Sequence, residues 1–453
     1  MRAARFPTVV LAYLVAVLLL GGASAAGLAA NVLLEIAGAV LLGWCIAVPG
    51  LVHHAAGGDP TRGLKLFVGA LAVLAVLQLI PLPPVIWSHL PGRGGIAAGF
   101  ALLGQPLPWL PISLSPWSTV AAFVWWIPAL ALLTAMLRGD APTPSAVARA
   151  VVIVAVVAVA IGAVQRAGGG LYFYEITNYG QGTGFFANAN HQAAFLLAAL
   201  ALAGAEHAQQ RVRQRVERRR VNDAVFAGVA LLLVVGVLLS NSLAGIGLLA
   251  PVIGGIALMF VPGVRLGRGI GLAGLAVAAA ALIGALLYGW LGGNVAHDTA
   301  GSAERLDYLA RGLPIVRDMA PFGSGLGTFV NLYDWYETSA SVENVFVNHA
   351  HDDLLELLIE AGIPGLIVLA VFLRWWLGRG ITVWRDHRDN PYMLAATLFT
   401  AAMLAHSLVD YPLRTAALSG LFAAGCALMV RAHRIAAVRK RREASKSSEL
   451  IPI

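Results

Sequence analysis

Twelve apolar segments, each about as long as a helix that crosses a lipid bilayer, occupy most of this 453-residue chain. A membrane-spanning helix takes about 20 predominantly apolar residues. Segments of this kind run over 8–28, 31–52, 64–81, 117–137, 146–165, 189–207, 223–240, 243–262, 270–291, 354–377, 391–410 and 413–432. Since 59% of the residues are hydrophobic and only 12% are charged, we predict an all-α, polytopic membrane protein rather than a soluble domain.

Basic residues fall mainly on one side of these segments. If both termini are cytoplasmic, only six of the 31 Lys and Arg residues lie on the outer side, namely Arg93, Arg166, Arg305, Arg311, Arg317 and Arg414. Because positive charge beside membrane helices stays in the cytoplasm, this asymmetry predicts an even number of spans and accounts for the net charge of +8. We expect no nucleic-acid partner, since the arginine-rich run 211–220 lies between two spans and has no interleaved aromatic residues.

This topology divides the chain into four parts. Residues 1–291 would form nine membrane helices, 292–351 a large outer loop, 352–433 the last three helices, and 434–453 a basic cytoplasmic tail. The first segment, with Arg2 and Arg5 before it and Ala23-Ser24-Ala25 near its end, also has the features of a cleaved signal peptide. The eleven segments that follow favour a first helix that is retained.

The large outer loop ends in a dense group of ionisable residues. His349, His351, Asp352, Asp353 and Glu356 lie in one short stretch beside an apolar segment, and such residues are costly there and usually functional. If a helix begins near Asp352, His351 lies at its positive end, which favours a neutral imidazole that can accept a proton. We therefore expect His351 to be a general base on the outer face.

Two other interpretations apply to parts of this group. The two histidines and two aspartates include the ligand types of a metal site, but no further histidine-rich motif lies on the outer side. We expect neither a metal nor a cofactor. Glu356 and Glu360, one helical turn apart, would point into the helix bundle, where bonding to neighbouring helices is at least as reasonable a role as catalysis.

Three of the outer arginines, Arg305, Arg311 and Arg317, lie in the stretch 303–317, which predicts a short amphipathic helix. Helical spacing lets one or two of them face a single anion site. The glycine-rich run 323–327 lacks the Lys-Ser/Thr of a P-loop, so we predict a tight turn. A second outer loop, 168–190, is rich in aromatic residues and amides, which suit either sugar recognition or a membrane-interface belt.

Several motifs resemble those of the O-antigen ligase and Wzy polymerase superfamily. The family pattern His-Asn-x-x-Leu-Glu-x-x-x-Glu-x-Gly-x-x-Gly is reproduced by His351, Leu355, Glu356, Glu360, Gly362 and Gly365. Similar family segments occur at Leu79 to Pro83, Gly184 to His191, Ala303 to Leu306, Pro321 to Gly325 and His406 to Arg414. Their order along the chain, and their placement on the outer face by charge, make the combination fairly specific.

The resemblance implies an inner-membrane glycosyltransferase of bacteria. Such an enzyme moves a glycan from undecaprenyl diphosphate to a hydroxyl on the periplasmic face, and the absence of Asp-x-Asp is consistent with metal-independent transfer. The acceptor is lipid A-core in a ligase and a second lipid-linked glycan in a polymerase. By this resemblance His351 is the base and Arg305 binds the donor diphosphate, with Arg311 and Arg414 as further candidates. Asp352, Glu356, Glu360, Asn188, Asn190 and His191 would support the site.

Two departures from the family pattern concern the donor site. The family's Ser-Arg at the outer start of a middle helix corresponds to Ser242-Leu243 here, so another outer arginine, such as Arg166 or Arg311, would have to supply the charge. Asp352 stands where the pattern has Asn. Ligase and polymerase remain alternatives, and a flippase of lipid-linked sugars would show the same spans. Transporters place ionisable sites near the bilayer midplane, whereas this group lies at the outer mouth, which favours an enzyme.

Overall fold

The computed structural model describes residues 5–25, 27–48, 59–213, 216–261, 299–337 and 347–430. Within these residues the chain is helical, with no strand and one isolated antiparallel bridge between Leu82 and Leu110. The all-α fold class is thereby confirmed. The predicted span 270–291, the start of the predicted outer loop and the basic tail lie outside the described residues.

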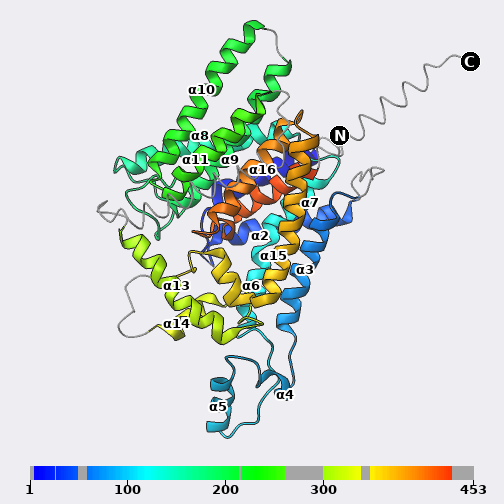
Figure 1. Ribbon diagram of the computed structural model, residues 1–453, viewed down its shortest axis with the longest axis vertical. Helices are drawn as coiled ribbons and strands as arrows, with labels where there is room; N and C mark the ends of the chain where they lie inside the picture. Colours follow the sequence, from blue (N-terminus) through cyan, green and yellow to red (C-terminus); the bar gives the residue numbers. More distant parts are fainter. Residues whose placement is uncertain are drawn as a thin grey trace, which may run out of the picture.

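The helices follow one another along the chain as α1 (Arg5–Leu20), α2 (Ala29–Ala47), α3 (Arg62–Leu79), α4 (Pro84–Trp87), α5 (Gly94–Leu102), α6 (Pro116–Trp125), α7 (Ile127–Leu137), α8 (Pro144–Arg166), α9 (Ala189–Arg213), α10 (Val216–Leu239), α11 (Leu243–Met259), α13 (Thr299–Met319), α14 (Phe329–Tyr336), α15 (Asp353–Asp386) and α16 (Pro391–His406). A short 3-10 helix, η1 (Pro412–Arg414), and a last apolar helix, Ala416–Val430, complete the bundle. The tip of α10 lies at one end of the long axis, and α13, α14, α4 and α5 lie toward the other (Figure 1).

Among the described residues, six segments are both long and apolar enough to cross a membrane: Ala29–Ala47, Arg62–Leu79, Pro116–Leu137, Pro144–Arg166, Arg218–Leu239 and Asp353–Asp386. Shorter apolar helices are Arg5–Leu20, Leu243–Met259, Pro391–His406 and Ala416–Val430. Each predicted apolar run within the described residues coincides with helix. The chain is therefore a membrane-type helical bundle, and the total of twelve spans stays a prediction.

Two of the predicted spans differ from the structure in detail. The helix predicted over 117–137 is divided at Trp126 into α6 and α7, because Pro128 lacks an amide hydrogen and its ring disfavours an uninterrupted helix. The first helix ends at Leu20, and residues 21–25 have no regular secondary structure. At this point Ala417 donates its N–H to the Gly21 carbonyl and Ala187 donates to the Gly22 carbonyl, at 2.9 and 3.1 Å.

Helix α9 forms the centre of the bundle. It packs against α8, α10, α11 and α16, and its residues from Ala193 to Ala203 are almost completely buried. The alanines in this stretch allow neighbouring helices to approach closely, as small residues do in membrane bundles. The close packing of α9 and α16 brings the start of α9 toward the segment that follows α16.

Helix α15 is interrupted at Gly362, whose φ of 54° and ψ of −145° are not helical. The turn Pro321–Gly327 lies against this interruption: Ser324 and Gly325 donate backbone N–H groups to the carbonyls of Ile359 and Glu360, both at 2.9 Å. A side chain on Gly362 would collide with the Pro321 carbonyl, so glycine is required here. This run is a tight turn, as predicted. Along the chain it connects α13 to α14, and its hydrogen bonds hold it against α15.

Candidate functional site

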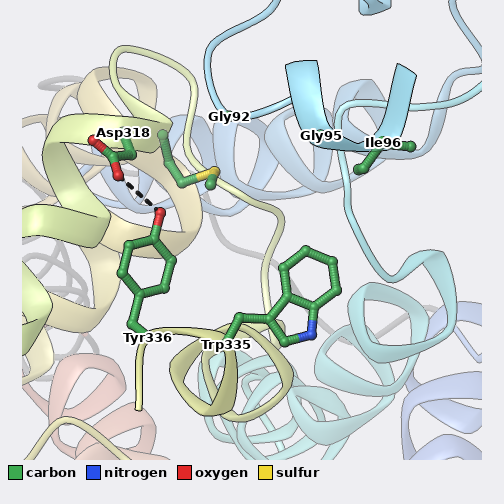
Figure 2. A pocket seen from close by; sticks show the side chains of 7 residues that line it. Gly92, Gly95, Ile96, Asp318, Trp335 and Tyr336 are labelled. Atoms are coloured by element: carbon green, nitrogen blue, oxygen red, sulfur yellow. Dashed lines mark hydrogen bonds between the residues drawn. The ribbon is translucent and has the colours of Figure 1, made fainter. Parts of the chain in front are cut away.

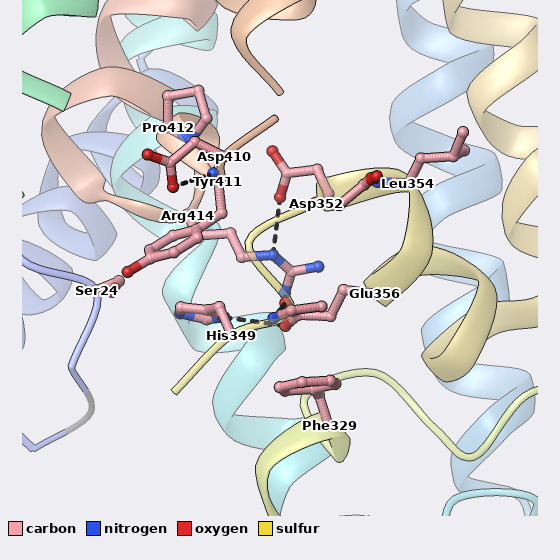
Figure 3. A network of polar contacts seen from close by, with 12 residues as sticks. Ser24, Phe329, His349, Asp352, Leu354, Glu356, Asp410, Tyr411, Pro412 and Arg414 are labelled. Atoms are coloured by element: carbon pink, nitrogen blue, oxygen red, sulfur yellow. Dashed lines mark hydrogen bonds and ion pairs between the residues drawn. The ribbon is translucent and has the colours of Figure 1, made fainter. Parts of the chain in front are cut away.

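Four parts of the chain meet at the start of α15. They are α13 through Tyr308, the segment 347–352, the start of α9 with the two residues before it, and the segment 406–414 that follows α16. Figure 3 shows the polar side chains from the last of these segments facing those of α15 and the histidine segment. Residues that are far apart in sequence thus form one polar cluster.

The segment that carries His351 is held by hydrogen bonds on both sides. Glu356 accepts the Ala350 N–H at 2.9 Å and lies 3.0 Å from His349 Nδ1. Asp352 caps α15 by accepting the N–H groups of Leu354 and Leu355 at 2.8 and 3.1 Å. The helix therefore begins where the sequence predicts, and Asp352 has the helix-terminal role expected of it.

His351 itself adopts a strained backbone conformation. Its φ is +51°, which a residue with a side chain rarely adopts. The ring stacks on Tyr308 with centroids 5.3 Å apart and meets Tyr411 edge-on at 4.8 Å. Its side chain is 26% exposed. Strain of this kind costs about 1–3 kcal/mol and persists where the surroundings fix the residue for a function.

Asp410 lies behind His351 and was not among the residues predicted from the sequence. Its carboxylate is completely buried and lies 3.6 Å from His351 Nδ1 and 3.9 Å from His191 Nε2. Asn190 donates its side-chain N–H to Asp410, and Asn188 does so at 3.5 Å. The predicted supporting residues Asn188, Asn190 and His191 therefore surround this carboxylate, which faces the histidine.

Arg414 occupies the centre of a second group of charges. Its guanidinium lies 2.8 Å from Glu356, 3.0 Å from Asp353 and 3.7 Å from Glu360 (Figure 3). The two glutamates are 1% and 2% exposed, so they point into the bundle as predicted. Because an uncompensated buried carboxylate is costly, Arg414 is the counter-ion of its own protein's carboxylates.

His349 belongs to this second group rather than to the surroundings of Asp410. Burial lowers the pKa of His349, and the neighbouring Glu356 carboxylate opposes that effect. The ring also packs on Tyr411, with centroids 4.4 Å apart. His349 and His351 thus face different acidic partners, although they lie two positions apart.

The other candidate cations differ in their surroundings. Arg311 donates to the Tyr333 hydroxyl at 3.3 Å, and Tyr333 packs edge-on against Tyr308. Arg305 lies three positions before Tyr308 on the same helix, and its side chain is outside the described part of the structure. Arg317 is exposed and pairs with Asp318 at 3.1 Å. Arg311 is thus one helical turn beyond the residue that stacks on His351.

Arg166 and Leu243, the two positions that concern the missing family arginine, also have defined surroundings. Arg166 donates to the Gly180 carbonyl at 2.6 Å, within the second outer loop. The Tyr172 hydroxyl in that loop accepts the Gly180 N–H at 2.8 Å. Leu243 lies at the first position of α11, after the capping residue Ser242. This second outer loop also bonds to other segments, since Tyr174 donates to the Leu20 carbonyl and Gly182 donates to the Leu239 carbonyl. Only its last residues reach the polar cluster.

No group of three or more His, Cys, Asp and Glu side chains in the described part of the chain has an arrangement that could hold a metal ion. The two histidines of the possible metal site have different partners: His351 faces Asp410, and His349 faces Glu356. Asp352 is engaged as a helix cap. The described geometry is that of a histidine–carboxylate pair next to a buried ionic network.

These features define a class of protein: a polytopic helical bundle with a loop-borne histidine held against a buried carboxylate at one end. A sequence model of the family described as O-antigen ligase matches residues 228–370, which include His351, Glu356 and Glu360. The match confirms the resemblance to the O-antigen ligase and Wzy polymerase superfamily. No curated protein matches the chain.

Proposed function

We propose that this protein is a membrane glycosyltransferase that moves a glycan from undecaprenyl diphosphate to a hydroxyl acceptor on the periplasmic face of the bacterial inner membrane. The family match supports this class of activity. The observation that carries the proposal is the His351 ring, partly exposed, fixed between two tyrosines and with Nδ1 toward Asp410. We propose lipid A-core as the acceptor, as in an O-antigen ligase, with repeat-unit polymerisation as the alternative.

In this mechanism His351 is the general base. With Nδ1 facing Asp410, Nε2 is the nitrogen that takes the proton of the acceptor hydroxyl. The acceptor oxygen forms a bond to the anomeric carbon as the bond from that carbon to the diphosphate oxygen breaks. The electron pair leaves with the diphosphate, which needs no proton, and the proton remains on His351 until solvent removes it.

Asp410 orients the ring and stabilises the imidazolium that forms. We predict that Asp410→Asn lowers the transfer rate by about 100- to 10,000-fold, as loss of an orienting carboxylate does in other His-dependent sites. The KM for the acceptor should change little, because Asp410 is buried and reaches substrate only through His351. Turnover measured with saturating donor tests this, and a rate within threefold of wild type would remove Asp410 from the mechanism.

Cationic groups must hold the donor diphosphate. Because Arg414 already pairs with three carboxylates, we assign this role to Arg305. Arg311, which lies 3.9 Å from the Glu337 carboxylate, is the second candidate. We predict that Arg305→Lys is severely impaired although the net charge is kept, because lysine lacks the planar, bidentate fork of arginine. Arg317→Lys is the control and should be mild, since Arg317 is exposed. Donor titrations compare the two, and a near-normal Arg305→Lys would move the role to Arg311.

We also predict that transfer continues after divalent metals are removed by EDTA from the purified protein in detergent. A base for the hydroxyl and cations for the leaving group suffice for this reaction. The competing mechanism positions a metal against the diphosphate. If chelation stops turnover and Mg²⁺, Mn²⁺ or Zn²⁺ restores it, the metal mechanism is the correct one.

The glycolipids of a deletion strain distinguish the activities. Loss of a ligase leaves finished polymer on undecaprenyl diphosphate and none on lipid A-core. Loss of a polymerase leaves single repeat units, either on undecaprenyl diphosphate or transferred to lipid A-core. Loss of a flippase traps lipid-linked sugar on the cytoplasmic side, and that result would contradict the proposed transfer reaction altogether.

A further inference from the structure

A cavity of about 590 Å³ lies away from the polar cluster, between the segment that begins α5 and the α13–α14 pair. It is lined by Gly92, Gly95, Ile96, Asp318, Met319, Trp335 and Tyr336. Figure 2 shows Trp335 and Tyr336 projecting from α14 toward the segment of Gly92 and Gly95. Its volume falls within the range of about 300–1,000 Å³ that is usual for small-ligand sites. None of the residues assigned to the transfer reaction lines it.

The lining combines an aromatic surface with a fixed polar pair. Trp335 is 70% exposed, so its indole ring offers a large aromatic surface that a partner can cover. Tyr336 donates its hydroxyl to Asp318 at 3.0 Å (Figure 2). Burial and this hydrogen bond raise the pKa of Tyr336 to about 12, so the phenol stays protonated. The second Asp318 oxygen receives Arg317 at 3.1 Å.

This chemistry selects among possible ligands. An anionic phosphate is disfavoured, because the lining contains a carboxylate and no cation. An acyl chain is also disfavoured, because it would have to lie against that carboxylate. A sugar ring fits both features, since its C–H face packs on an indole and its hydroxyls donate to a carboxylate. We propose that this cavity is a carbohydrate subsite that holds a part of the glycan several sugar units from the reacting end.

The position of the cavity agrees with such a role. Helix α13 runs directly from the cluster to the cavity: Tyr308 stacks on His351, and Asp318 lines the cavity. Ten residues of helix correspond to about 15 Å at 1.5 Å per residue. A chain of several sugars that begins at His351 could therefore continue along α13. This inference rests on the proposed function for the identity of the glycan, but not for the binding event itself.

Two substitutions alter the cavity without touching the cluster. Trp335→Ala removes the aromatic surface. Gly95→Phe fills the space, and it should fold because a Cβ on Gly95 has no heavy atom within 4 Å. Matched controls lie nearby: a Cβ on Gly99, one turn further along α5, also meets nothing within 4 Å, and Trp109 is 64% exposed. Neither residue lines the cavity.

The test is calorimetric titration of the purified protein in detergent, with His351→Ala present in every sample so that no transfer occurs. The probe is the water-soluble glycan released by mild acid from the polyprenyl diphosphate pool of the source cells. We expect Trp335→Ala and Gly95→Phe to weaken binding about tenfold, and Gly99→Phe and Trp109→Ala to leave it unchanged. Equal affinity in all variants, or no binding by the parent, would overturn the subsite.

Two further outcomes separate this inference from its alternatives. If the two cavity variants bind glycan normally but incorporate poorly into phospholipid vesicles, the cavity faces lipid and the subsite is wrong. If glycan binding depends on the cavity but the protein with His351 intact transfers nothing, the proposed transfer reaction fails and the subsite stands. The binding measurement therefore does not depend on the fate of the mechanism.

Discussion

Replacement of His351 by alanine is expected to lower the transfer rate by about 100- to 10,000-fold, the usual loss when a general base is removed. The protein level should stay near that of wild type, because the ring is partly exposed and its main partners are two tyrosines and Asp410. Complementation of a deletion strain, with the protein quantified in the same membranes, measures both quantities.

The comparison with His349 and His89 makes this experiment specific. His349 contacts Glu356 and not Asp410, so His349→Ala should reduce stability more than it reduces turnover per folded molecule. His89 is exposed and lies just after α4, so His89→Ala should be neutral. If His349→Ala is inactive while folded and His351→Ala is active, the base is misassigned by two positions.

Loss of Arg414 is expected to have the largest effect on stability. Arg414→Met leaves Asp353, Glu356 and Glu360 without their shared cation. Breaking a buried ion pair by removing one partner typically costs about 3–5 kcal/mol. The apparent melting temperature in detergent should fall markedly, and the double variant with Glu360→Gln should recover part of the loss because one uncompensated carboxylate is then removed.

An exposed ion pair provides the control for this measurement. Arg317→Met breaks a pair in which the arginine side chain is 79% exposed, and such pairs contribute only about 0–1 kcal/mol. If the Arg414→Met protein melts like wild type but needs a much higher donor concentration for transfer, Arg414 is a donor-binding residue after all.

The sequence was sufficient wherever local patterns determine the structure. The polar group before an apolar run predicted a helix that begins near Asp352, and α15 begins at Asp353. The glycine-rich run 323–327 predicted a tight turn, and its three glycines have positive φ. These features depend on neighbours along the chain. The spacing of Glu356 and Glu360 similarly predicted that both point into the bundle.

The partners of those residues could not be predicted, because they depend on how distant helices pack. Asp410 reaches His351 because the segment after α16 lies against the start of α15, where Asp353 donates its backbone N–H to the Ser407 carbonyl at 3.1 Å. No local pattern encodes this contact. For the same reason the sequence could not predict that Arg414 lies beside Asp353, Glu356 and Glu360. One signal for Asp410 was present: an acidic residue that directly follows an apolar run, in a segment similar to a family motif.

The irregular segment after α1 connects parts of the chain that are far apart in sequence. Gly21 accepts a hydrogen bond from Ala417 at the start of the last helix, and Ser24 accepts one from Asn348, three residues before His351. Residues 21–24 therefore contact both the last helix and the segment that leads to His351, although they are far from both in sequence. A partly inserted chain would lack this closure, and cleavage after Ala25 would remove it. We therefore expect the proposed transfer to require both of these contacts.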